Sequence, residues 1–257
     1  MSNPFYYFSI GHEGLAIEIW FNDVLLDTDP DGAFRDRQFL NNLYVLDGEN
    51  SLKVKVGLPG QPPRKPESLD LKVGLHEVFS EEDSLPEPIA EITFPGTDIP
   101  SFPAVLDTTV QINSPFGKWS WEQGEVIDIE DPQTIPSVMN LLGKLHQTLS
   151  SRDIDTITNI MDVKARDMAS AYFMPVEERL EGQRDFYREV FDDPQFEMEP
   201  LQSFDNLRFV PMAHGRLLLI EQKNGNSALE SKELSEGYCF CLPVILAKFG
   251  NELKVVR

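Results

Sequence analysis

The segment Asp27-Thr-Asp29-Pro-Asp31-Gly32 is the densest group of candidate metal ligands in the chain. Carboxylates at positions one, three and five before a glycine match the first half of a calcium-binding loop, where they surround the ion. The second half does not match, because position twelve is Gln38 and position nine is Arg35, a cation. The alternative is an acidic surface turn in which Asp side chains cap backbone amides. We therefore expect a turn here and no metal.

Trp119 and Trp121 are spaced two residues apart in an expected strand, so their rings share one face. Paired indole rings could form a platform that stacks against a sugar. The residues that alternate with them, Lys118, Ser120 and Glu122, are polar. We favour an amphipathic strand whose indoles are buried in the core or against the C-terminal half, because large aromatic side chains dominate cores and interfaces.

Cys239 and Cys241 are the only cysteines. In an extended segment both point to the same face, where a disulfide between them would be strained. They could be half of a thiolate metal site, but a second ligand pair is missing. The alternating residues Tyr238, Phe240 and Leu242 favour two small buried hydrophobic side chains instead. So few cysteines are typical of a cytoplasmic protein.

The four histidines occupy different contexts: His12 and His214 in expected hairpin turns, His76 in a strand and His146 on a helix. None is near a serine or cysteine in a nucleophile elbow, so a catalytic triad has no anchor. His146 could form an acid–base pair with Asp153, Asp155 or Tyr172, but we favour a half-exposed position on the helix flank. No glycine-rich phosphate-binding loop is found. Catalytic and ligand-binding residues stay unassigned, and no cofactor is expected.

The first half of the chain carries the pattern of an all-β domain. Short segments of alternating hydrophobicity are separated by turn residues about every ten positions, which is typical of an antiparallel sandwich or barrel. The expected strands are Phe5–Ile10, Leu15–Phe21, Val24–Asp27, Ser51–Val56, Leu69–Val78, Ala90–Phe94, Leu106–Ile112, Lys118–Glu122 and Glu125–Ile129. Gly11-His12-Glu13-Gly14 has the composition of a hairpin turn. The proline-rich stretches Leu58–Pro66 and Leu85–Pro103 are expected to be loops or edges.

After Pro132–Pro136 the pattern changes to three helices followed by strands, an α+β layout. The helices are expected at 137–149, from about 154 to Tyr172, and from Pro175 to just before Pro194. The expected strands are Phe196–Gln202, Asn206–Met212, Arg216–Lys223, Gly237–Lys248 and Glu252–Arg257, with hairpin turns at 213–215 and 249–251 and a longer loop from Asn224. We predict two domains, residues 1–133 and 134–257.

Two stretches resemble known families. Residues 17–26 and 43–56, with their Asn turn and Gly-Glu-Asn turn, resemble the galactose-binding-like β-sandwich family. That resemblance includes no sugar-contacting position and implies only a fold. Residues 136–257 resemble, by layout, the NTF2-like family of cone-shaped α+β barrels. This second resemblance implies three helices packed on a curved sheet, a pocket between them, and an open sheet face that could form a homodimer.

The charge is strongly negative and unevenly distributed. The formal net charge is −21, and residues 1–135 carry 24 acidic against 8 basic side chains. An acidic surface repels phosphate backbones and anionic lipid, so we expect no nucleic-acid or membrane binding and consider a basic protein partner. The N-terminal residues lack the cationic and apolar regions of a secretory signal.

We expect a soluble cytoplasmic protein that is a non-catalytic binding or protein-interaction protein, and a homodimer through the C-terminal sheet. One alternative is a small-molecule enzyme or ligand-binding protein that uses a pocket in the C-terminal domain. A second alternative is carbohydrate binding by the β-sandwich.

Overall fold

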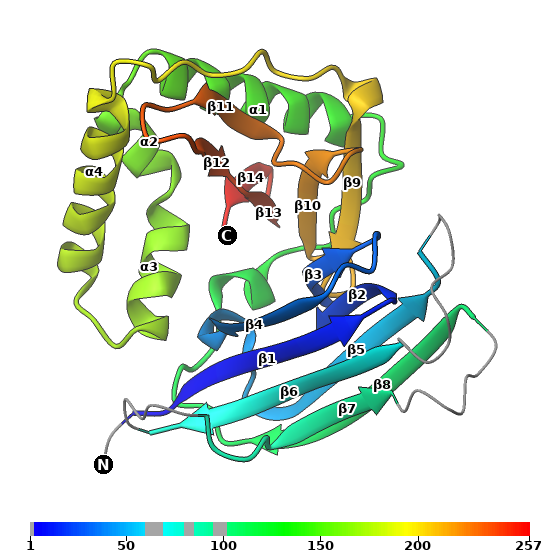
Figure 1. Ribbon diagram of the computed structural model, residues 1–257. Coiled ribbons are helices and arrows are strands. Elements are labelled where there is room, and N and C mark those ends of the chain that lie inside the picture. Colours follow the sequence, from blue (N-terminus) through cyan, green and yellow to red (C-terminus); the bar gives the residue numbers. More distant parts are fainter. Residues whose placement is uncertain (1–2, 60–68, 80–84, 95–101) are drawn as a thin grey trace. The chain divides into compact units, whose positions relative to one another are not determined.

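The computed structural model describes residues 3–59, 69–79, 85–94 and 102–257 (Figure 1). The chain divides into two compact units, Met1–Lys118 and Trp119–Arg257. Residues 60–66 and 95–101 of the two proline-rich stretches lie outside the described residues. Both units contain antiparallel sheets and the second also contains four α-helices, so the protein belongs to the α+β class.

The described residues of the N-terminal unit form two four-stranded antiparallel sheets. One has the order β4-β1-β6-β7, formed by β4 (Arg35–Leu40), β1 (Phe5–Glu13), β6 (Asp70–Val78) and β7 (Ala90–Phe94). The other has the order β3-β2-β5-β8, formed by β3 (Val24–Asp29), β2 (Ala16–Phe21), β5 (Gly48–Gly57) and β8 (Ala104–Ile112). Alternate residues of both sheets contribute to one hydrophobic core. Phe8 of β1 and Phe21 of β2 meet there edge to face, with ring centroids 5.3 Å apart.

The expected hairpin between the first two strands is wrong. β1 pairs with β4 and β6, whereas β2 pairs with β3 and β5, so the chain passes from one sheet to the other after Glu13. His12 therefore lies within β1, opposite Arg35 and Leu71, and is buried. The composition of residues 11–14 is typical of a turn, but hydrogen bonds to β4 and β6 hold residues 11–13 in an extended conformation.

The next turn and the later strands of this unit follow the expected pattern. Asn22 and Asp23 adopt positive φ angles of 51° and 59°, as a two-residue hairpin turn requires, and connect β2 to β3. The expected strands at 51–56, 69–78, 90–94 and 106–112 are confirmed as β5 to β8. The short charged strand β4 was not expected, because it shows no alternation of hydrophobic residues.

The first residues of the C-terminal unit do not form the two strands expected at Lys118–Glu122 and Glu125–Ile129. Residues Ser120–Gln123 form a 3-10 turn, because the Glu122 side chain accepts a hydrogen bond from the Trp119 amide at 2.6 Å. Only an isolated bridge between Glu125 and Lys248 remains of the second expected strand. Ile127 also donates its amide hydrogen bond to the Gly215 carbonyl at 2.8 Å. Glu125 and Ile127 thus form backbone contacts with Lys248 and with the turn at Gly215, while the domain boundary after residue 133 stays a prediction.

The C-terminal unit combines four α-helices with a four-stranded antiparallel sheet and a two-stranded one. The helices are α1 (Thr134–Ser150), α2 (Ile154–Ile160), α3 (Asp162–Ala171) and α4 (Val176–Asp192). The larger sheet has the order β14-β13-β10-β9, formed by β14 (Glu252–Val255), β13 (Val244–Phe249), β10 (Leu217–Gln222) and β9 (Leu207–Met212). The smaller one pairs β11 (Leu229–Glu233) with β12 (Cys239–Leu242). Helices and strands share one core.

The second expected helix is two helices that meet at Met161. There φ is −89° and ψ is 6°, outside the helical range, although the backbone hydrogen bonds from Met161 to Ile157 and from Ala165 to Met161 are kept. The bend turns α3 toward α4, and Figure 1 shows these two helices side by side. The first and third expected helices are confirmed as α1 and α4.

Three strand predictions in this unit also need correction. The single strand expected at Gly237–Lys248 is two strands, β12 and β13, which belong to different sheets. The segment 196–202 forms only an isolated bridge at Met198, and the loop expected after Asn224 contains β11. The hairpin turns at 213–215 and 249–251 are confirmed, since they connect β9 to β10 and β13 to β14.

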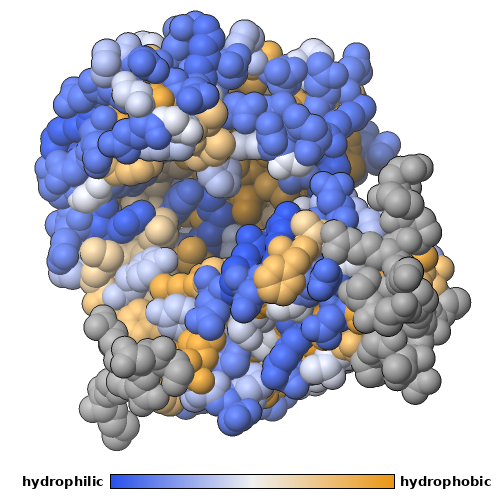
Figure 2. All heavy atoms as spheres, in the orientation of Figure 1, coloured by the Kyte–Doolittle hydropathy of each residue, from blue (hydrophilic) through white to orange (hydrophobic). Residues whose placement is uncertain are grey.

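Hydrophilic residues dominate the surface of α4 in Figure 2, where the helix exposes mostly charged side chains. Among the described residues, no helix is long and apolar enough to cross a lipid bilayer.

Candidate functional site

A cavity of about 310 Å³ lies between α3, α4 and β12 in the C-terminal unit. This volume is at the lower end of the range for small-molecule sites. The residues that give it chemical character are Lys164 of α3, Arg179, Gln183, Phe186 and Tyr187 of α4, and Phe240 of β12. None of the described residues that line it carries a carboxylate.

Helical spacing places the α4 residues on the cavity. Arg179, Gln183 and Tyr187 follow one another at intervals of four, so their side chains lie on one face of the helix. Phe186 precedes Tyr187 and lies at the edge of that face. The cavity therefore has a polar end near the start of α4 and an aromatic end further along the helix.

Three aromatic rings form the apolar wall. The Phe186 ring lies 6.1 Å from that of Phe240, and the Tyr187 ring lies 6.4 Å from it, measured between centroids. Tyr187 and Phe240 are buried, whereas Phe186 is about half exposed. Burial raises the pKa of Tyr187 to about 12, against the opposing effects of a hydrogen bond with Gln183 and the charge of Arg179. The Tyr187 phenol is therefore neutral at physiological pH.

Lys164 is a partly buried amine in a positive environment. Burial, together with the smaller effects of the nearby charges of Arg257 and Arg179, lowers the pKa of Lys164 to about 8. No ion pair among the described residues includes Lys164 or Arg179. In a chain with a net charge of −21, a cavity with two such cations is an unusual local environment.

Two polar atoms at the cavity lack hydrogen-bond partners within the described part of the chain. These are Nε of Arg179 and Oε1 of Gln183, and both atoms are buried. Within the described part of the chain, the Arg179 guanidinium has one hydrogen-bond acceptor, the weak Sδ of Met168, at 3.2 Å from Nη2. A buried polar group without a partner is costly and needs an explanation, and a bound polar ligand would supply one.

A buried ion pair between Arg257 and Asp167 lies close enough to the cavity for the Arg257 charge to act on Lys164. Arg257 donates a hydrogen bond from Nη1 to Asp167 Oδ2 at 2.7 Å, and its guanidinium lies 5.6 Å from the centre of the Trp119 ring. The Ser120 hydroxyl donates a hydrogen bond to the other carboxylate oxygen of Asp167. Because Asp167 is occupied by these partners, it does not neutralise Lys164, and the cavity keeps its positive character.

The tryptophans that the sequence singled out are both buried, as expected, with 1% and 4% of Trp119 and Trp121 exposed. Their predicted strand is wrong, since they lie at a 3-10 turn. The Trp119 ring lies against the guanidinium of Arg257, whose charge acts on the cavity residue Lys164.

The cysteine prediction is wrong, because Cys239 and Cys241 are both exposed. The intervening Phe240 and the following Leu242 point into the core instead. Burial and the charge of Glu230 raise the pKa of the Cys241 thiol, which disfavours its reactive thiolate. Among the described residues, no group of three or more His, Cys, Asp or Glu side chains could hold a metal ion.

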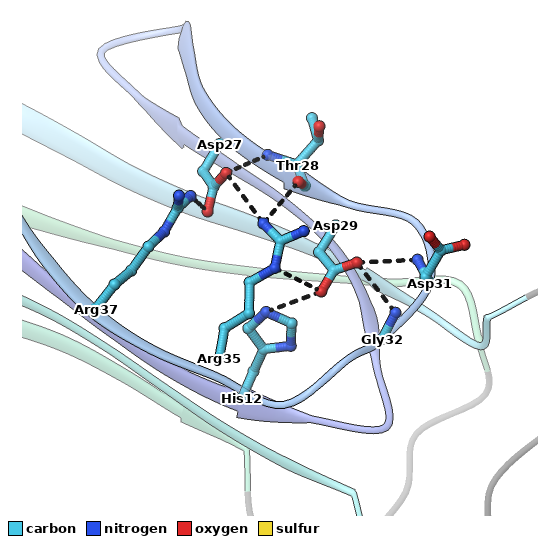
Figure 3. A network of polar contacts seen from close by, with 8 residues as sticks. All are labelled: His12, Asp27, Thr28, Asp29, Asp31, Gly32, Arg35 and Arg37. Carbon is cyan, nitrogen blue, oxygen red and sulfur yellow. Dashed lines mark hydrogen bonds and ion pairs between the residues drawn. The ribbon is translucent and has the colours of Figure 1, made fainter. Parts of the chain in front are cut away.

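The acidic segment at residues 27–32 forms a network with basic side chains in the N-terminal unit (Figure 3). Asp29 Oδ1 accepts hydrogen bonds from the amides of Asp31 and Gly32, at 3.0 and 3.2 Å, which confirms the expected capping turn. Its other oxygen lies 3.1 Å from Nε of Arg35. Arg37 pairs with Asp27. Asp29 is fully buried, so the turn is not wholly a surface feature.

His12 completes this network from β1. Its Nε2 lies 3.4 Å from Asp29 Oδ2, and the ring is buried (Figure 3). Burial lowers the pKa of His12, and although the charge of Asp29 opposes this, those of Arg35 and Arg37 add to it. The network is a structural connection between β1, β3 and β4, with its carboxylates already matched by cations.

The remaining histidines are held by local partners. His146 Nε2 lies 2.8 Å from the Glu199 carbonyl oxygen, and its ring is partly buried on α1. Asp153 instead caps α2, where it accepts hydrogen bonds from the amide and hydroxyl of Thr156. His76 joins the Ser9 hydroxyl, at 2.8 Å, to the Pro86 carbonyl, at 2.7 Å. His214 is exposed at its hairpin turn, as expected.

Comparison of the chain with family models, curated proteins and solved structures found no match. The chemistry of the cavity therefore carries the functional proposal. Sequence reasoning did not single out Lys164, Arg179 or Gln183, although the four-residue spacing along α4 was present in the sequence.

Proposed function

We propose that the C-terminal unit binds a small organic anion, a carboxylate attached to an apolar or aromatic body, in the cavity between α3, α4 and β12. The observation that carries this proposal is the presence of Lys164 and Arg179, two cations without carboxylate partners among the described residues, beside aromatic walls. This proposal takes up the alternative of a ligand-binding pocket and needs no catalytic step.

The guanidinium of Arg179 supports a carboxylate as the polar part of the ligand. Its planar donors match the two oxygens of a carboxylate, and such charge-assisted hydrogen bonds are about twice as strong as neutral ones. A hydrogen bond to a charged group contributes about 1.5–3 kcal/mol. A bound carboxylate would also give the buried Nε of Arg179 the partner that it lacks.

The aromatic wall supports an apolar body of limited size. Tyr187 and Phe240 present buried rings, and the half-exposed Phe186 offers a further surface near the entrance. Stacking against such rings adds roughly 0.5–1.5 kcal/mol beyond area burial. A cavity of about 310 Å³ suits a single-ring compound better than a nucleotide or an oligosaccharide.

The specific fold families, the partner and the oligomeric state expected from the sequence remain predictions. The β-sandwich and NTF2-like layouts, the basic protein partner and the homodimer through the C-terminal sheet are compatible with the proposed anion binding. A sedimentation measurement that returns only monomer at high micromolar concentration would argue against the homodimer.

Isothermal titration calorimetry with phenylacetate, phenylacetamide and phenethylamine tests the proposal. The three probe compounds share a body and differ in charge, so we expect binding of phenylacetate and a loss of at least tenfold in affinity for the neutral and cationic compounds. The variant Arg179→Gln should weaken phenylacetate binding by about tenfold or more.

The matched control is Arg188→Gln on the same helix. Arg188 is exposed and pairs with Glu181 and Asp185, away from the cavity residues, so its removal should leave the affinity unchanged. Thermal unfolding separates binding from folding, since Arg179→Gln removes a partly buried cation without a carboxylate partner and should not lower the midpoint of unfolding. Equal affinity for phenylacetamide, or full affinity in Arg179→Gln, would contradict the proposal.

A further inference from the structure

We infer that Lys164 is a nucleophilic amine that condenses reversibly with an aldehyde or ketone group of the bound anion, so that the preferred ligands are oxo acids. This inference rests on the proposed function, because the anion must first occupy the cavity. It goes further by assigning a covalent step to one residue and a carbonyl group to the ligand.

The placement of Lys164 next to Arg179 is the first support. The two residues come from α3 and α4, line the same cavity, and are close enough for the charge of one to act on the other. In a 2-oxo acid the carbonyl carbon is bonded directly to the carboxylate. A carboxylate held by the Arg179 guanidinium therefore keeps the carbonyl within the same small space that Lys164 lines.

The protonation state of the amine is the second support, because only a neutral amine attacks a carbonyl carbon. With burial and the charges of Arg257 and Arg179 lowering the pKa of Lys164 to about 8, about a quarter of the amines are neutral at pH 7.5. An ordinary lysine would have roughly one neutral amine in a thousand at that pH. Desolvation beside other cations is a known way to activate a lysine nucleophile.

Arg257 acts as a positioning residue for this step. Asp167 and Trp119 hold its guanidinium in place, so that its positive charge stays near Lys164. The carboxylate of Asp167 in this region is already bonded to Arg257 and Ser120, and the charges that act on Lys164 are those of Arg257 and Arg179. The charge of the Lys164 ammonium is thus disfavoured by its described neighbours.

The step balances without an oxidant or a further reactant. The nitrogen lone pair forms a bond to the carbonyl carbon while the carbon–oxygen π bond breaks, which gives a carbinolamine. The two amine protons then leave with the former carbonyl oxygen as water, and a carbon–nitrogen double bond remains. Hydrolysis by water reverses the reaction and releases the oxo acid.

Reductive trapping tests the inference. The full-length protein is incubated with phenylpyruvate and sodium cyanoborohydride, and intact mass and peptide mapping locate the reduced adduct. We expect one adduct per chain at Lys164, and its rate of formation should rise about tenfold between pH 7 and pH 9 with a midpoint near 8. Lys164→Arg keeps the positive charge and should lose the adduct.

Lys232→Arg is the matched control. Lys232 is an amine of the same unit, its ion pair with Glu197 raises the pKa of its ammonium, and its loss should leave the adduct unchanged. 3-Phenylpropionate, which has the same body and carboxylate but no ketone, should compete with phenylpyruvate and form no adduct.

The two proposals fail in different ways. Arg179-dependent binding of 3-phenylpropionate without any adduct at Lys164 would overturn the covalent step and keep anion binding. No binding of either acid would overturn both. Adducts spread evenly over the surface lysines, or a full yield of adduct in Lys164→Arg, would also overturn the assignment of Lys164.

Discussion

Arg257 and Asp167 form a buried ion pair in the C-terminal unit, with 2.7 Å between Nη1 and Oδ2. Only 4% of Arg257 and 7% of Asp167 are exposed. The attraction between the two charges offsets the free energy of removing them from water. Loss of either partner leaves the other as an uncompensated buried charge. The pair lies next to Lys164, and so it connects the stability of the unit with the electrostatics of the cavity.

Replacement of Asp167 should be strongly destabilising. Asp167→Asn leaves the Arg257 guanidinium buried without its counter-charge, and we expect a loss of about 3–5 kcal/mol in the free energy of unfolding. Urea denaturation followed by circular dichroism measures this loss. The control is Asp162→Asn, which removes an exposed pair with Arg166 and should cost less than about 1 kcal/mol. Similar losses in unfolding free energy for the two variants would show that burial does not set the contribution of the Asp167–Arg257 pair to stability.

A pH-dependent loss of stability should originate at His12. Burial lowers the pKa of His12 below its usual 6.5 in the folded state, with Arg35 and Arg37 adding to the effect and Asp29 opposing it. As the pH falls below 6.5, His12 becomes protonated in the unfolded chain before it does in the folded chain. The free energy of unfolding therefore decreases. Unfolding free energies at pH 7.5, 6.5 and 5.5 should fall more steeply for the wild type than for His12→Gln. Parallel pH profiles would argue against this assignment.

The fold could be predicted where local pattern and tertiary environment agree. Val54 and Val56 of β5 alternate with polar residues and are buried, so that strand is readable from the sequence. His12 shows the opposite case. It continues the buried alternation of β1, but its glycine-flanked composition indicates a turn. His12 is held in a strand because β1 pairs with the charged strand β4, and no local sequence pattern indicates that pairing.

The cavity could be predicted only in part for the same reason. The spacing of Arg179, Gln183 and Tyr187 places them on one helical face, which the sequence shows directly. The approach of Lys164 depends on the bend at Met161, and Phe240 belongs to a strand whose partner, β11, carries no clear hydrophobic pattern. Sequence periodicity identifies faces of elements, whereas the cavity arises from how those faces pack.

Calcium should not stabilise the protein through Asp27, Asp29 and Asp31. Arg37 and Arg35 already pair with the first two carboxylates, so a cation would have to displace positive side chains that are fixed by β4. We expect no change in the thermal unfolding midpoint on adding about 1 mM calcium, a concentration at which even weak protein sites fill. A rise in the midpoint that Asp29→Asn abolishes would contradict this prediction and restore the calcium-loop hypothesis.

Asn50 should be among the most sensitive polar positions of the N-terminal unit, because its fully buried amide satisfies the backbone at both ends of a turn. Its Oδ1 accepts a hydrogen bond from the Leu46 amide at 2.8 Å, and its Nδ2 donates to the carbonyls of Leu46 and Gly48. Asn50→Ala leaves these groups without partners and should cost about 3 kcal/mol in unfolding free energy, measured by urea denaturation. Glu49→Ala changes the exposed neighbour and should cost no more than about 0.5 kcal/mol. Equal effects at the two positions would mean that the turn does not depend on the Asn50 amide.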